Sequence, residues 1–85
     1  QTWTTYSQAN GLASDEVNAI TQASDGTMWF GTSNGVSRLK DGSWQSYTEA
    51  DGLPGNRVSS LAVAPDERIW VGTTFDGVAI LDPTE

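Results

Sequence analysis

The sequence has no cysteine and no histidine among its 85 residues. Without cysteine the chain has neither disulfide bonds nor thiolate ligands for a metal. The absence of histidine removes the commonest general base and the commonest metal ligand. Its serines and threonines therefore lack the partners that activate a nucleophile, and no nucleophile-elbow motif is present. We expect no catalytic residue, no metal site, no cofactor and no enzyme activity.

Positive charge and long apolar runs are also scarce. The chain has 4 basic and 11 acidic residues, which gives a net charge of −7. Phosphate recognition needs clustered Lys and Arg, so we expect no nucleic-acid partner. The same repulsion disfavours an anionic membrane surface, and no apolar run approaches a membrane-spanning length. We interpret four acidic residues as turn formers rather than metal ligands: Asp25, Asp41, Asp66 and Asp76.

What the sequence does contain is an internal repeat. Residues 44–47 repeat the Trp-x-x-Tyr pattern of residues 3–6, and residues 70–73 repeat residues 29–32. The offset is 41 up to the insertion of Phe75 and 42 after it. A period of about 40–45 residues with Trp and Gly-Thr punctuation is typical of four-stranded propeller blades.

Strand signals dominate each repeat, and Gly- or Asp-containing turns separate them. We therefore predict an all-β fold without helices. The expected strands of repeat one are 17–23, 27–32, 36–39 and 43–48, and those of repeat two are 58–64, 68–73 and 78–81. Residues 2–7 echo residues 43–48 and form a further expected strand.

These strands predict one two-blade unit over residues 1–85, with repeat one at about 3–43 and repeat two at about 44–85. If A is the innermost strand and D the outermost, their order is D-ABCD-ABC. Two blades cannot close a ring, so we expect strand 2–7 to complete a blade of another copy. Head-to-tail association would then close a homo-oligomeric ring, first choice four chains and eight blades. The expected assembly residues are Trp3, Tyr6, Val78, Ile80 and Leu81.

A family resemblance follows from the spacing of these residues. Gly11-Leu12 before Val17 and Ile20, then Asp25-Gly26 before residues 29–32, resembles the two-component regulator propeller repeat. The resemblance implies blades from extracytoplasmic sensor regions of bacterial hybrid histidine kinases, which often face oligosaccharide-like signals. Repeat two departs from the pattern in having Glu67 instead of the hairpin glycine, and in the inserted Phe75. The chain does not begin with Met, so we expect an excerpt of a longer array; it also resembles engineered propeller fragments.

Two functional hypotheses remain open at this stage. The first is a self-assembling scaffold in which aromatic residues fill the wedge between blades: Trp29, Trp44, Tyr47 and Trp70. The second is a sensor module that binds a carbohydrate or another small molecule through loops at the channel mouth. Its candidate ligand-binding residues are Asn10, Asp15, Asn34, Asn56, Arg57, Phe75 and Asp76.

Overall fold

Short runs of β-branched and aromatic residues alternate with turns, and each run forms a strand. The computed structural model describes residues 1–83. The strands in this part of the chain are β1 (Val17–Gln22), β2 (Met28–Thr32), β3 (Gly35–Lys40), β4 (Ser43–Tyr47), β5 (Val58–Val63), β6 (Ile69–Thr73) and β7 (Val78–Leu81).

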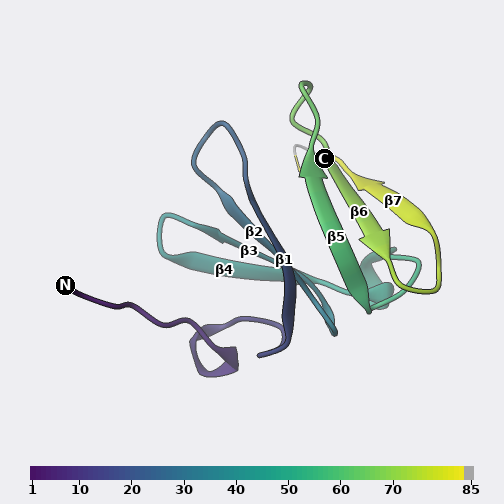
Figure 1. Ribbon diagram of the computed structural model, residues 1–85. Helices are drawn as coiled ribbons and strands as arrows, with labels where there is room; N and C mark the ends of the chain where they lie inside the picture. The colour runs from purple at the N-terminus through teal and green to yellow at the C-terminus, as the bar shows by residue number, and fades with distance from the viewer. Residues whose placement is uncertain (84–85) are drawn as a thin grey trace.

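The strands form two antiparallel sheets with the orders β1-β2-β3-β4 and β5-β6-β7. We call them blade 1 and blade 2. Figure 1 shows the sheets standing side by side, and β5 contacts both β1 and β2 of the first sheet. The predictions of an all-β chain and of one four-stranded and one three-stranded sheet are confirmed.

The main hydrophobic core lies between the blades. Blade 1 contributes Trp29 and Val36, while blade 2 contributes Val58, Ile69 and Val71, and all five side chains are buried. Successive side chains of a strand point to opposite faces of its sheet. Each blade therefore meets the other through one face only.

The hairpin that joins β1 to β2 and the hairpin that joins β5 to β6 have the same tight geometry. Ala23 N donates to Thr27 O at 2.9 Å, and Ala64 N donates to Arg68 O at the same distance. Gly26 in the first turn has φ +91°, and Glu67 replaces it in the second turn with φ +71°. The departure from the family pattern thus leaves the turn closed but places a side chain in a strained left-handed conformation.

The prediction that the chain has no helix is wrong in one detail. Two short 3₁₀ helices, η1 (Gln8–Asn10) and η2 (Glu49–Asp51), lie in the connections that precede β1 and β5. Ser7 caps the first and Thr48 caps the second, each paired with a polar residue three positions later. This spacing was present twice in the sequence and is the signal that the prediction missed.

Residues 1–7 form no strand in the single chain, although 2–7 were expected to be one. Tyr6 nevertheless packs edge-on against Trp44 of blade 1, with ring centroids 5.6 Å apart. Tyr6 therefore lies on the face of blade 1 that is turned away from blade 2, and Figure 1 shows the chain before it leading away from both sheets. Among the described residues, no helix has the length and apolar character needed to cross a membrane.

Candidate functional site

Equivalent residues of the two repeats differ sharply in burial. Trp29 of blade 1 is 1% exposed because blade 2 covers it, whereas its equivalent Trp70 is 46% exposed. Val36 is likewise buried, and its equivalent Val78 is exposed. Blade 2 therefore presents an open apolar face that matches the covered face of blade 1.

The opposite face shows the reverse asymmetry. Val58 of blade 2 is fully buried against blade 1, whereas its equivalent Val17 is 37% exposed. Leu61 packs against the core, and its equivalent Ile20 is exposed. The chain thus carries two open faces, and each has the chemical character of a face that is buried in the same molecule.

The contact between the blades is close and specific. A Cβ atom added at Gly31 would lie 2.6 Å from Cγ1 of Val58, so glycine allows the strands to approach. Asn18 Nδ2 donates to the Val58 carbonyl oxygen at 2.8 Å, which adds a polar link between β1 and β5. Such contacts fix one register between the blades.

Four of the five expected assembly residues are exposed. Trp3 is 83% exposed, and Tyr6, Val78 and Ile80 are also exposed. Leu81 instead packs partly against the core between the blades. Val78, Ile80 and Leu81 belong to β7, which is an edge strand of blade 2.

The aromatic residues of blade 1 form two groups on its two faces. Trp29 stacks on Tyr47 toward blade 2, with centroids 6.2 Å apart. Trp44 packs against Phe30 on the other face at 5.5 Å. In blade 2, Trp70 lies on the open face. It would fill the space between two blades only if a further blade packed over this face.

Three candidate ligand-binding residues stabilise their own loops. Asn10 Oδ1 accepts from the Ser7 backbone N–H at 3.0 Å, and Asp15 Oδ1 accepts from the Gln8 N–H at 2.7 Å. Asn56, the equivalent of Asp15, accepts from Glu49 N–H in the same way at 2.7 Å. These side chains hold η1 and η2 in place.

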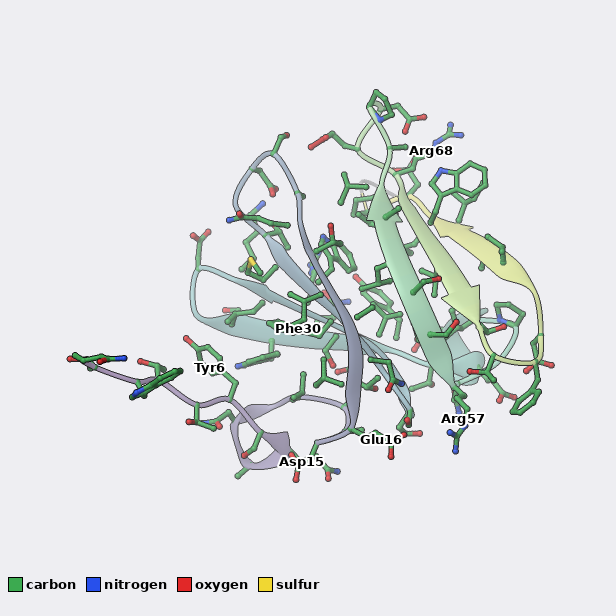
Figure 2. All side chains as sticks on the ribbon, in the orientation of Figure 1. Tyr6, Asp15, Glu16, Phe30, Arg57 and Arg68 are labelled. Atoms are coloured by element: carbon green, nitrogen blue, oxygen red, sulfur yellow. The ribbon has the colours of Figure 1, made fainter. Side chains whose placement is uncertain are left out.

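The loops that carry the candidates lie at one end of the molecule, where Figure 2 places Asp15, Glu16 and Arg57 together. Arg57 Nη1 lies 3.9 Å from Glu16 Oε1, so an exposed ion pair links the two blades. Asn34 is exposed, and Phe75 is 81% exposed. The carboxylate of Asp76 lies against Gly55. None of the seven candidates lines any of the three main hollows in residues 1–83, and their role in binding stays a prediction.

The sequence family described as two component regulator propeller matches the chain twice, at residues 11–34 and 52–75. These segments run from each Gly-Leu connection into the turn after the second strand and together cover more than half of the chain. The chain belongs to this family. A search of curated proteins found no match.

Among solved structures, this propeller chain is similar to the extracellular domain of a putative hybrid two component system from B. thetaiotaomicron. The TM-score is 0.68 at 22% sequence identity, and the match covers 94% of this chain. The chain spans only 13% of that structure. At this identity the likeness establishes the blade fold.

Two of the hollows in the described residues lie between the two blades. One lies between the hairpin tips beside Trp29, Asp25, Lys40 and Glu67, but Lys40 Nζ pairs with Asp25 Oδ2 at 3.3 Å. Hydrogen bonds from Thr27 and the nearby Lys40 lower the pKa of Asp25 to about 2. No group of three or more potential metal ligands occurs in the described part of the chain. The other hollow is apolar and lies between the outer parts of the blades.

Proposed function

We propose that the chain is a non-enzymatic structural unit that binds copies of itself head to tail. The observation that carries the proposal is the reciprocal burial of the repeats. Trp70 and Val78 are exposed where Trp29 and Val36 are covered, and Val17 is exposed where Val58 is covered. If blade 1 of a second copy packs on blade 2 as blade 2 packs on blade 1, both open faces become buried. Burial of apolar surface is the main driving force for such association.

The same superposition of repeats specifies the contacts of the junction. Val17 of one copy would pack on Gly72 of the next, as Val58 packs on Gly31 within the chain. Glu16 and Arg57 occupy equivalent positions in the two repeats. A Glu16–Arg57 pair within the chain therefore predicts a second Glu16–Arg57 pair between copies. Opposite charges would alternate around the channel mouth, which favours the head-to-tail arrangement.

Propellers generally have about 4–8 blades, so two blades per chain and closure give an even total. We propose four chains and eight blades. Native mass spectrometry and sedimentation equilibrium should detect one closed species at four times 9.1 kDa. A chain that remains monomeric at micromolar concentration would overturn the proposal.

A charge-swap series tests the geometry of the junction. Glu16→Arg and Arg57→Glu each create like-charged neighbours, while the double variant restores alternation in reversed order. Exposed pairs contribute about 0.2–1 kcal/mol, so each single variant should raise the half-assembly concentration by about 1.4- to five-fold. The double variant should recover most of the loss. Equal weakening in the double variant would contradict the alternating arrangement.

The alternative proposal is a sensor module that lies outside the cytoplasm and binds a carbohydrate or other small molecule. Its support is Phe75, an inserted and 81% exposed aromatic side chain, together with the extracellular origin of the similar structure. Aromatic rings suit the apolar faces of sugars. A glycan array and a thermal-shift screen should then give a saturable hit that Phe75→Ala abolishes. A screen without any saturable hit would leave only the structural role.

A further inference from the structure

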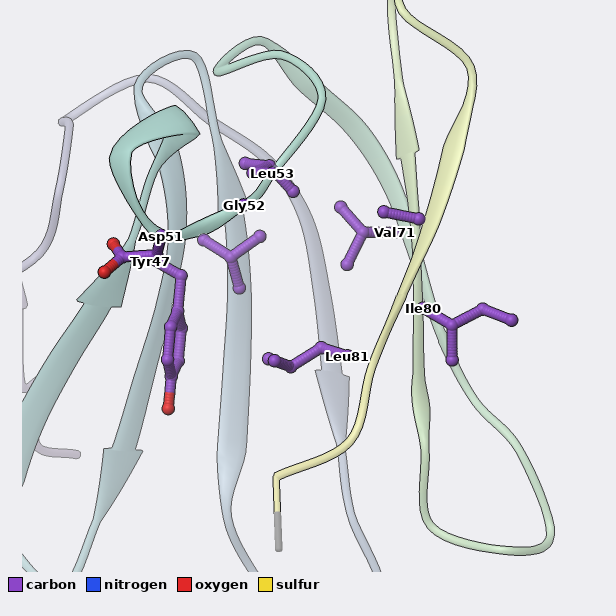
Figure 3. Close-up of a pocket in the computed structure, with 9 residues that line it drawn as sticks. Tyr47, Asp51, Gly52, Leu53, Val71, Ile80 and Leu81 are labelled. Carbon is purple, nitrogen blue, oxygen red and sulfur yellow. The ribbon is translucent and has the colours of Figure 1, made fainter. Parts of the chain in front are cut away.

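An apolar cavity lies between the two blades beside β7, the strand at the edge of blade 2. Figure 3 shows it between Tyr47 and Leu53 on one side and Val71 and Leu81 on the other. Its volume is about 110 Å³. The space is mostly apolar and open to solvent on one side, so an aromatic side chain can enter it from outside the chain.

The first repeat shows what fills the equivalent place in blade 1. There the indole of Trp44 packs on Phe30, with centroids 5.5 Å apart, and meets the edge of Tyr6 at 5.6 Å. It also lies so close to Gly11 that an added Cβ would be 2.8 Å from Trp44 Cγ. In the sheet register, Trp44 pairs with Leu39 of β3.

The four residues that surround Trp44 have equivalents in repeat two. Adding the offset of 41, or 42 after Phe75, converts that group into one that lines the cavity: Tyr47, Gly52, Val71 and Leu81. A Cβ added at Gly52 meets nothing within 4 Å, whereas at Gly11 it meets the indole. Three of the four surrounding residue types are the same and Val71 takes the place of Phe30, but only the first repeat has the aromatic ring.

The residue equivalent to Trp44 is Trp3, which is 83% exposed. Figure 1 places the N-terminus and β7 on opposite sides of the molecule. We infer that the cavity is the binding site for the indole of Trp3 from a second copy. This inference rests on the proposed head-to-tail association and identifies the residue that anchors it.

The strand register supports the same placement. Within blade 1, Leu39 pairs with Trp44 and Val36 pairs with Tyr47. The equivalent pairs in the junction are Leu81 with the partner copy's Trp3, and Val78 with its Tyr6. Residues 2–7 then add as a fourth strand to β7 and supply the backbone hydrogen bonds that this edge lacks. Trp3 enters the cavity, while Tyr6 on the opposite face stacks on Trp70, as Tyr47 stacks on Trp29.

The experiment measures the half-assembly concentration of full-length variants by sedimentation equilibrium. Trp3→Ala removes the anchor, and Thr4→Ala alters the same segment at the position facing away from the cavity. Gly52→Ala narrows the cavity; Gly42→Ala, also at positive φ and with nothing within 4 Å, is its control for backbone strain. Truncating an aromatic anchor costs about 2 kcal/mol or more, so Trp3→Ala should raise the half-assembly concentration at least about 30-fold. The added Cβ of Gly52→Ala overpacks the cavity at a cost of about 1–3 kcal/mol, so this variant should raise it about five-fold or more. The controls should stay within about three-fold.

Acrylamide quenching of tryptophan fluorescence tests the inference even if Trp3→Ala or Gly52→Ala folds poorly, because it uses only the wild type and the conservative variant Trp3→Phe. Assembly should reduce the number of tryptophans that acrylamide can quench in both proteins. The reduction should be larger by one in the wild type, because Trp3 becomes buried there and is absent from Trp3→Phe. If Trp3→Ala assembles as tightly as Thr4→Ala, or Trp3 stays fully quenchable in the assembly, the inference is wrong while self-association stands. If the wild type itself does not assemble, the proposed function fails first.

Discussion

The contact between Gly31 and Val58 allows a quantitative test of how the blades pack. Gly31 lies in β2 at a position where its backbone does not need positive φ, so alanine would normally be accepted or slightly favoured there. The added Cβ would however lie 2.6 Å from Val58 Cγ1 and 3.4 Å from Leu61 Cγ. Carbon atoms pack best at about 3.5–4.0 Å, so the first contact is about 1 Å too short.

Neither side can yield easily, because Val58 is fully buried and β-branched. Overpacking of this kind costs about 1–3 kcal/mol. With a slope of about 1 kcal/mol per molar urea for a small domain, Gly31→Ala should lower the unfolding midpoint by about 1–3 M. Urea titrations followed by tryptophan fluorescence, at one fixed protein concentration, measure the shift.

A double-mutant cycle separates this clash from a general weakening of the strand. Val58→Ala removes the methyl group that meets the new Cβ, so Gly31→Ala combined with Val58→Ala should be destabilised less than the sum of the single variants. Additive effects, or a Gly31→Ala variant as stable as the wild type, would refute the proposed close packing of the blades.

Three further variants test individual features. Because hydrogen bonds from Thr27 hold the folded pKa of Asp25 at about 2, below its unfolded value, its contribution is present above about pH 4 and disappears toward pH 2. Asp25→Asn should therefore lose less stability than the wild type between pH 4 and 2 in acid titrations followed by circular dichroism. Glu67→Gly and Glu67→Ala both lose the hydrogen bonds from Ser24, but only glycine relieves the left-handed strain, so the glycine variant should be more stable by about 1–2 kcal/mol in urea. Phe75→Ala should change the unfolding free energy by less than about 0.5 kcal/mol, because the ring is exposed.

Much of the fold could be predicted because the pattern occurs twice. The seven observed strands lie within one or two residues of the expected ranges, for example 17–22 against 17–23. The sequence of each repeat alone could not predict which of two equivalent residues is buried. Trp29 and Trp70 have nearly the same sequence neighbours, and they differ in burial because only Trp29 has a blade packed over it.

The loop residues show where the chemistry of a side chain is ambiguous. Asn10, Asp15 and Asn56 have the polar groups that bind ligands, and the same groups cap short 3₁₀ turns. The Ser7–Asn10 and Thr48–Asp51 spacings could have revealed this use. The cavity beside β7 could not be foreseen, since it forms only when η2 and both blades meet.

The three-stranded state of blade 2 has a consequence for how fast copies would exchange. In the proposed ring, each chain begins in one blade and continues into the next, so the polypeptide itself crosses every junction. Separating two copies then requires the outer strand to unpair from β7 while the two sheets move apart. Coupling these events makes dissociation a partial unfolding step with a high barrier. Rings with a split blade at each junction should therefore exchange subunits far more slowly than their interface area alone suggests, and their assembly state should depend on the history of the sample.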